Sequence, residues 1–436
     1  MNFFGLRPFQ IIFIAVFVLL ALVGLYLFAS FSGFGGGTKS IGTVVIWGAL
    51  PQESVDAGLR ALRQTDKGYS NVVYVERPAA TMGRDLADAI AAGAGPDLII
   101  VTQEELMGER NKLSVIPYSA ISERTFRDSF LPIGELFLAT EGMYGIPVTV
   151  DPIVLYYNRT MLSTNGIVRP PSTWEAVTGL VPLLTARTPE GTITKSTIAL
   201  GEYENIDNAR AIISLLFLQS GSEISRKTSN GSVQASFAGG ASATGIAPAE
   251  SALNFYTQFA NPAKTTYSWN RALRNSRQTF LAGDSAFYLG YASEQPMLAA
   301  GNPNLDFDMA SVPQPGTSSV RATYARAYAF AIPKASKNAD GALASALALI
   351  AKERIILIAR EAAMAPATRS TLVPADGEIY TPVFYPQALV ARGWLSPAPL
   401  TTDAIFETMI SDITTGRRLT RDALSIAERA LNAQLP

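Results

Sequence analysis

Short apolar runs and helix-spaced apolar positions alternate along the chain after residue 42. The runs at residues 43–47, 71–76 and 97–101 are apolar without alternation, which predicts strands that are covered on both faces. The segments between these runs repeat apolar residues at helical spacing. These residues are Val55, Leu59 and Leu62 in the first segment, and Met82, Leu86 and Ile90 in the second. The β-α-β-α-β order predicts a doubly wound α/β sheet flanked by helices.

The rest of the chain predicts a second set of elements with the same two periodicities. Helices are expected over 206–218, from Pro248, from Asp340 through Ile358, and over 402–414 and 420–434. Strands are expected over 285–291 and 325–333. Residues 225–250 are rich in Ser, Gly and Ala, which predicts a loop.

The N-terminus carries an apolar segment of a different kind. Residues 11–29 contain no charged side chain, and nineteen helical residues are long enough to cross a hydrocarbon core of about 30 Å. Arg7 precedes the segment and Lys39 is the next charge, so the positive-inside rule places the short N-terminus in the cytoplasm. We expect a stub and membrane anchor over 1–29, a flexible tether over 30–42, and the bulk of the chain outside the cytoplasm. A cleaved signal peptide and a buried helix are the alternatives.

The composition of the chain limits its possible partners and functions. The chain of 436 residues suits two domains, and its net charge of −1 argues against nucleic acid as a partner. It contains no cysteine and no histidine, so disulfides, thiol nucleophiles, lipidated cysteines and the commonest metal ligand are excluded. An enzyme is disfavoured, and low charge with scattered aromatic residues favours a neutral or weakly polar ligand.

Aromatic residues gather at the ends of the expected strands, and Asp151 lies in an apolar run. Sugar rings pack on aromatic planes while their hydroxyls bind polar groups, so this mixture suits a carbohydrate cleft, although core packing is the alternative for each ring. An ionisable group in an apolar strand is costly unless it is paired or solvated, which favours a cleft edge for Asp151. The adjacent Tyr156 and Tyr157 are poor iron ligands, since neighbours in a strand point to opposite faces.

Several motifs, in order, carry a resemblance to a known family. They are "VVIWGA" (44–49), "GPDLIIV" (95–101), "YGIPVTVDPIVLYYN" (144–158), "PSTWEAV" (171–177), "FLAGDSAFYLGY" (280–291) and "AFAIPKASKNADGALA" (329–344). Together they resemble the extracellular solute-binding proteins of family 1, the maltose-binding type that serves ABC importers. The resemblance covers nearly all of the chain after residue 42.

The resemblance implies a two-lobed, periplasmic-binding-protein-like (type II) fold, in which each lobe is a mainly parallel sheet flanked by helices. Lobe I is expected over 43–150 and 330–370, and lobe II over 151–329 and 371–436. No cofactor and no metal are implied. The implied ligand contacts are Trp47, Gly48, Ala49, Asp151, Trp269, Tyr288, Tyr291, Tyr324 and Tyr328.

The resulting hypothesis is a membrane-anchored binding protein that captures a sugar, an oligosaccharide or a similar polar solute for an ABC transporter permease. A carbohydrate-active enzyme on the cell surface and a ligand-sensing module on the same fold are the alternatives.

Overall fold

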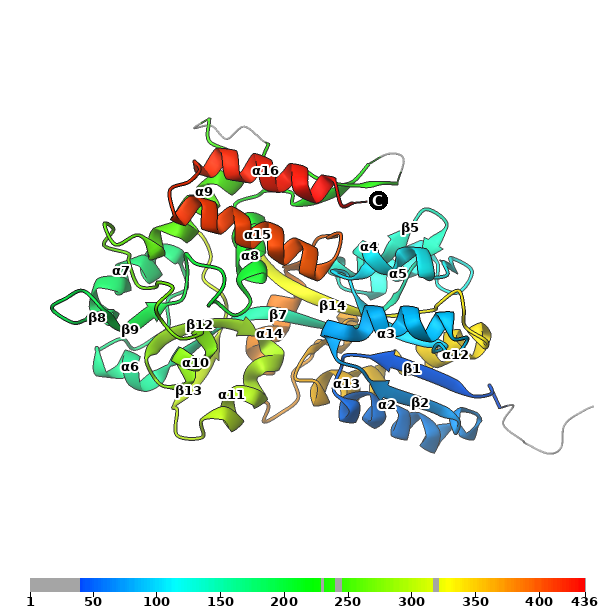
Figure 1. The fold of residues 1–436 in the computed structure, drawn as a ribbon. Coiled ribbons are helices and arrows are strands. Elements are labelled where there is room, and N and C mark those ends of the chain that lie inside the picture. Colours follow the sequence, from blue (N-terminus) through cyan, green and yellow to red (C-terminus); the bar gives the residue numbers. More distant parts are fainter. Residues whose placement is uncertain (1–39, 229–230, 240–244, 317–320, 436) are drawn as a thin grey trace, which may run out of the picture.

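A single mixed β-sheet runs through both lobes of the molecule (Figure 1). The computed structural model describes residues 40–228, 231–239, 245–316 and 321–435. The strand order along the sheet is β2-β1-β3-β14-β7-β12-β9-β8. These strands are β1 Val44–Gly48, β2 Val72–Glu76, β3 Leu98–Thr102, β7 Ile146–Asn158, β8 Ala186–Arg187, β9 Ile193–Ile198, β12 Ser285–Tyr291 and β14 Thr323–Ala331.

The first lobe is built on β1, which pairs in parallel with β2 and β3. Its main helices are α2 Gln52–Thr65, α3 Ala79–Ala91, α12 Ala339–Leu349 and α13 Lys352–Glu361. Val55, Leu59 and Leu62 of α2 are buried, and α2 packs against α13. The predicted β-α-β-α-β order is therefore confirmed, because its apolar faces are the ones that pack on the sheet.

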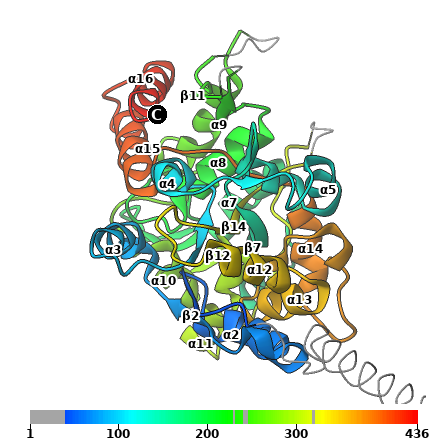
Figure 2. The same ribbon diagram turned by 90° about the vertical axis from the view of Figure 1, so that its right-hand side faces the viewer.

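The second lobe is built on β12 and β9, which are parallel to each other. Its helices are α6 Arg159–Thr164, α7 Trp174–Leu184, α8 Ala209–Gln219, α9 Pro248–Thr257, α10 Ser276–Leu281, α11 Gln295–Gly301, α15 Pro399–Thr414 and α16 Thr420–Asn432. The last two pack against each other, and Figure 2 shows them on the opposite side of the molecule from α12 and α13.

Shorter elements complete the two lobes. They are β4 Ile116–Pro117, β5 Leu138–Ala139, β6 Gly142–Met143, β10 Ser225–Lys227, β11 Val233–Ala235, β13 Phe307–Ala310, β15 Ala365–Pro366, β16 Ala391–Arg392, α4 Leu106–Glu109, α5 Glu123–Ser129 and α14 Thr381–Leu389. The 3₁₀ helices that matter for the site are η3 Pro132–Phe137 and η5 Ala292–Glu294.

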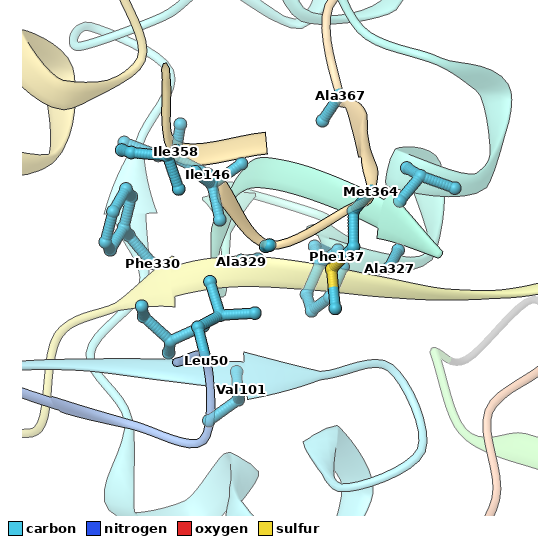
Figure 3. Close-up of a cluster of buried hydrophobic side chains, with 14 of the residues drawn as sticks. Leu50, Val101, Phe137, Ile146, Ala327, Ala329, Phe330, Ile358, Met364 and Ala367 are labelled. Carbon is cyan, nitrogen blue, oxygen red and sulfur yellow. The ribbon is translucent and has the colours of Figure 1, made fainter. Parts of the chain in front are cut away.

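Two strands, β7 and β14, cross between the lobes side by side and antiparallel. Twelve of the thirteen residues of β7 are buried, and they enter two separate apolar clusters. One cluster fills the first lobe and continues along one face of the crossing strands. Figure 3 shows part of it, with Phe137, Ile146, Ala327, Ala329, Phe330 and Met364. The second cluster fills the second lobe and includes Ile153, Tyr291 and Tyr324.

The expectation of mainly parallel sheets is wrong for the centre of the molecule. Strand β14 is antiparallel to both β3 and β7, and β12 is antiparallel to β7. The reason is that β7 leaves the first lobe while β14 returns to it, so the two crossings run in opposite directions. The exact lobe boundaries, placed at residues 150/151, 329/330 and 370/371, stay a prediction.

Two local expectations also need correction. The helix expected from Asp340 through Ile358 is two helices, because Ala351 is extended (φ −62°, ψ 148°) and interrupts the helix between Leu349 and Lys352. Its cap is Asn338, whose side chain accepts a hydrogen bond from the Gly341 amide at 3.0 Å. The expected loop at 225–250 contains the antiparallel hairpin of β10 and β11.

The apolar segment at residues 11–29 lies outside the described residues. Within the part of the chain that the structure describes, no helix combines the length and the apolar character needed to cross a membrane.

Candidate binding site between the lobes

The crossing strands present polar side chains on one face of the sheet. Tyr324, Arg326 and Tyr328 of β14 are spaced two apart, so they share a face, while the alanines between them join the first-lobe cluster on the other. Arg326 lies opposite Asp151 of β7 in the strand register. Tyr291, at the end of β12, lies opposite Ile153 of β7 and therefore reaches the same face. This face is where the two lobes meet.

Glu104 is the centre of the site. It follows the end of β3 in the first lobe and is only 4% exposed. One carboxylate oxygen accepts the hydroxyl of Tyr324, and the other accepts Nε of Arg326 at 3.1 Å and Nη2 of Arg210 at 2.8 Å. Burial works against its charge, but Arg326 and Arg210 outweigh burial and hold the pKa of Glu104 below its usual range.

Arg210 connects this carboxylate to the second lobe. It stands in the first turn of α8 and is 9% exposed. Its Nη1 donates to the carbonyl of Pro399 at 2.8 Å and to Asp403 at 3.3 Å, and Asp403 also accepts the hydroxyl of Tyr203 at 2.6 Å. Of the ion pairs among the described residues, Arg210–Glu104 is the one that joins a helix of the second lobe to the first lobe. The site is therefore a bridge between lobes.

Arg326 lies over the ring of Tyr291, with 4.3 Å between the guanidinium carbon and the ring centroid. Its side chain is 28% exposed, and that of Asp403 is 42% exposed. The hydroxyls of Tyr291 and Thr149 are both buried and have no hydrogen-bond partner within the described chain. A buried hydroxyl without a partner is costly, so these two groups favour a site that a ligand or water completes.

Asp151 lies on the same face but is 1% exposed. Its two oxygens accept the backbone amide of Ser293 at 3.0 Å and the Ser293 hydroxyl at 2.6 Å. Burial raises its pKa to about 7, although the Ser293 hydrogen bonds and Arg326 act in the opposite direction. The Ser293 hydrogen bonds from η5 thus compensate only part of the cost of burying this carboxyl in an apolar strand.

The structure brings four of the predicted ligand contacts together: Asp151, Tyr291, Tyr324 and Tyr328. Trp269 lies apart, because it is completely buried in the second lobe and its Nε1 donates to Asn205 at 3.0 Å. Tyr288 also lies apart, because its hydroxyl donates to Glu294 at 2.6 Å within the first-lobe cluster that continues behind β12.

Trp47, Gly48 and Ala49 stand at the carboxyl end of β1. Trp47 is 8% exposed, and the guanidinium carbon of Arg77 lies 4.2 Å from the centroid of its ring. Gly48 is needed for packing, since a Cβ there would lie 2.8 Å from Cβ of Ile100. Their contact with a ligand stays a prediction.

Three central residues, Glu104, Arg210 and Arg326, are absent from the sequence-based prediction. Each is a charged residue next to or within an apolar run, in "IIVTQEEL", "NARAIISLL" and "ARAYAFAIP". The cost argument that identified Asp151 applies equally to them. Applied to every charge in an apolar run, it would have found the cluster.

A separate groove of about 1190 Å³ also lies between the lobes. It is lined by η3 and β5 of the first lobe and by β10, β11 and residues 391–395. Lys227 of β10 reaches across the groove, and its Nζ donates a hydrogen bond to the carbonyl oxygen of Leu138 at 2.6 Å. None of the residues of the Glu104 cluster lines this groove, and η3 packs with Ala327 and Ala329 on the opposite face of β14.

Comparison with known proteins identifies the family and the fold. A family model described as bacterial extracellular solute-binding protein matches residues 56–351. Among solved structures, a cyclic α-maltosyl-1,6-maltose binding protein from Arthrobacter globiformis has a TM-score of 0.71 at 17% identity, covering 90% of this chain and 98% of that one. A cyclo/maltodextrin-binding protein complexed with maltotetraose has a TM-score of 0.70 at 14% identity, covering 91% and 98%.

A Thermus thermophilus maltotriose binding protein has a TM-score of 0.64 at 15% identity, covering 90% of this chain and 100% of that one. At these identities the solved structures establish the two-lobed fold and nothing finer. Among curated protein sequences, no match was found.

The raised pKa of Asp151 predicts how stability depends on pH. Between about pH 4 and pH 7 the folded protein keeps a proton that the unfolded chain has lost, so the free energy of unfolding falls as the pH rises through this window. For this group the loss amounts to about 4 kcal/mol at most and is complete above pH 7. Asp151→Asn keeps an amide that can pair with Ser293 and does not titrate, so the variant should lose this slope.

Chemical denaturation of both proteins between pH 4 and pH 8 measures the difference. The exposed Asp376→Asn variant is the control for removal of a carboxylate. If the free energy of unfolding of the wild type and of Asp151→Asn changed with pH in parallel, the pKa of Asp151 would not be raised by burial.

Proposed function

The chain belongs to the bacterial extracellular solute-binding protein family, and from this membership we propose that it captures a sugar or an oligosaccharide for an ABC importer. The observation that carries the proposal is the polar cluster around Glu104, which lies where both lobes and both crossing strands meet. A solute bound there contacts both lobes at once. The ligand then favours the closed arrangement over the open one, and the closed form delivers it to the permease.

The neighbours and the composition of the site support a sugar as the solute. The three solved structures compared above are described as binding cyclo/maltodextrin, cyclic α-maltosyl-1,6-maltose and maltotriose. The cluster offers three tyrosines, an arginine side chain that is 28% exposed and two unpartnered hydroxyls, the polar and aromatic mixture that suits a sugar.

We infer binding without bond chemistry. Glycoside hydrolysis needs two carboxyl groups that face the scissile bond. Here Glu104 accepts hydrogen bonds from Tyr324, Arg326 and Arg210, and Asp151 accepts them from Ser293. These carboxyl groups organise the site and are poorly placed as an acid and a nucleophile.

We further propose that residues 11–29 anchor the protein in the membrane, with the two lobes outside the cytoplasm. The support is the length of this uncharged segment and the absence of any cysteine that could carry a lipid.

Ligand binding tests the site directly. Tyr291→Ala removes a ring and an unpartnered hydroxyl from the shared face, and Asp151→Ala removes the carboxyl that orders Ser293. Each substitution should raise the Kd for the bound oligosaccharide by about tenfold or more. Isothermal titration of the full-length protein, after a thermal-shift screen of oligosaccharides, measures the change.

Tyr157→Ala is the matched control, because Tyr157 belongs to β7 but its hydroxyl pairs with Asp308 away from the cluster. If both Tyr291→Ala and Asp151→Ala kept the wild-type affinity and unfolded at the wild-type temperature, the proposed binding site would be wrong.

Membrane anchoring has its own test. The full-length protein should sediment with membranes, and mass spectrometry should find residues 1–29 still attached. A variant that lacks residues 1–29 should remain in the supernatant. A mature N-terminus at or beyond residue 30 would contradict the anchor and show that residues 1–29 are a cleaved signal peptide.

A further inference from the structure

A second buried carboxylate, outside the Glu104 cluster, joins three elements of the second lobe. Glu294 is the last residue of η5 and is 8% exposed. One of its oxygens accepts the Tyr291 backbone amide at 3.0 Å and the side-chain amide of Asn208 at 2.6 Å. The other accepts the hydroxyl of Tyr288 at 2.6 Å and Nε of Arg277 at 3.1 Å. Glu294 therefore ties η5 to β12, to α10 and to the start of α8.

Asn208 makes the connection to α8. It is the N-cap residue of this helix and has a left-handed backbone conformation (φ 60°, ψ 21°). An N-cap asparagine commonly accepts a hydrogen bond from the first helical turn, but within the described chain the Asn208 side chain makes no such bond. Its amide donates to Glu294 instead and, at 3.2 Å, to the Tyr288 hydroxyl. The side chain thus fixes the beginning of α8 against η5.

Arg210 lies two residues beyond Asn208, in the first turn of α8, so its reach depends on where that helix begins. Its Nη2 donates to Glu104 of the first lobe at 2.8 Å. A hydrogen bond of this length is lost when its atoms move apart by about 1 Å, so a small shift of the start of α8 removes it. The hydrogen bond from Asn208 to Glu294 opposes such a shift.

The same carboxylate also acts on the strands of the site. It holds the backbone amide of Tyr291, whose ring packs on Arg326. Its neighbour in η5, Ser293, donates to both oxygens of Asp151. Both sides of the interlobe site in the second lobe are therefore fixed through η5.

We propose that Glu294 and Asn208 are positioning residues of the binding site. Their hydrogen bond directs Arg210 to Glu104, and in this way it sets how tightly the closed lobes hold a solute. Neither residue needs to touch the solute. This inference rests on the proposed function, since it explains the affinity of the same site.

Asn208→Gly separates the side chain from the backbone. Glycine adopts the left-handed conformation without strain, so the variant loses only the amide. In titrations of the full-length protein with maltotriose, the Kd should rise about tenfold. In an Arg210→Ala background the same substitution should change the Kd by less than about twofold, because the side chain that it positions is gone. Asn304→Gly, at an exposed asparagine outside the cluster, is the matched control and should keep the wild-type Kd.

Asn208→Asp gives a second measurement. Aspartate also tolerates the left-handed conformation, so the variant changes only the group that faces Glu294. At about pH 5 the new carboxyl can carry a proton and donate it to Glu294, whereas at about pH 8 two carboxylates repel each other. The ratio of its Kd to the wild-type Kd should be about 1 at the lower pH and about tenfold or more at the higher pH. Asp151, Arg277 and Tyr288 are the same in both proteins, so the ratio removes their titration.

The outcomes separate this proposal from the proposed function. A wild-type Kd in Asn208→Gly overturns the positioning role, and so does a tenfold effect that persists in the Arg210→Ala background. If Asn208→Gly fails to fold, an equal ratio for Asn208→Asp at both pH values overturns it.

If maltotriose does not bind, spin labels at Gln64→Cys and Ser163→Cys, both exposed and in different lobes, decide the question without a solute. Asn208→Gly should then lengthen the distance between the lobes, and an unchanged distance overturns the positioning role. The absence of a response to every oligosaccharide in the thermal-shift screen would overturn the proposed function, whatever this distance is.

Discussion

The structure depends on one buried negative charge. Glu104 is taken out of water at the junction of the two lobes, and an isolated carboxylate there would cost several kcal/mol. Tyr324 and Arg326 of a crossing strand and Arg210 of the second lobe compensate it together. The partners come from β14 and from α8 of the second lobe, so the compensation is complete only when the lobes are close. Buried Glu104 is costly without Arg210 of the second lobe, and pairing with Arg210 therefore favours the closed arrangement of the lobes.

The crossing strands explain why this pairing sits at a hinge. Strands β7 and β14 connect the lobes and alternate between two environments, with Tyr324 and Arg326 on one face and small alanines packed on the first-lobe cluster on the other. The Glu104 cluster lies on the first face, and the groove bridged by Lys227 lies on the side of η3.

Local patterns predicted much of the fold, and pairing over long distances limited the prediction of the site. The strands β1 to β3 and the buried face of α2 follow from periodicity within a few residues. The break at Ala351 was missed because the helical pattern continues across it. Asp151 was found through the cost of a charge in an apolar run. The same cost argument marks Arg210 and Arg326, but the local pattern does not reveal that both pair with Glu104, which lies 106 and 222 residues away.

The distance between the lobes tests the central role of Glu104 most directly. The chain has no cysteine, so Gln64→Cys on α2 and Ser163→Cys on α6, both exposed, give one spin label in each lobe. Pulsed electron paramagnetic resonance should find a short interlobe distance in the otherwise unchanged protein and a longer one after Glu104→Gln, since Arg210 keeps Asp403 while the bridge to the first lobe is weakened. Identical distance distributions with and without Glu104→Gln would contradict the account.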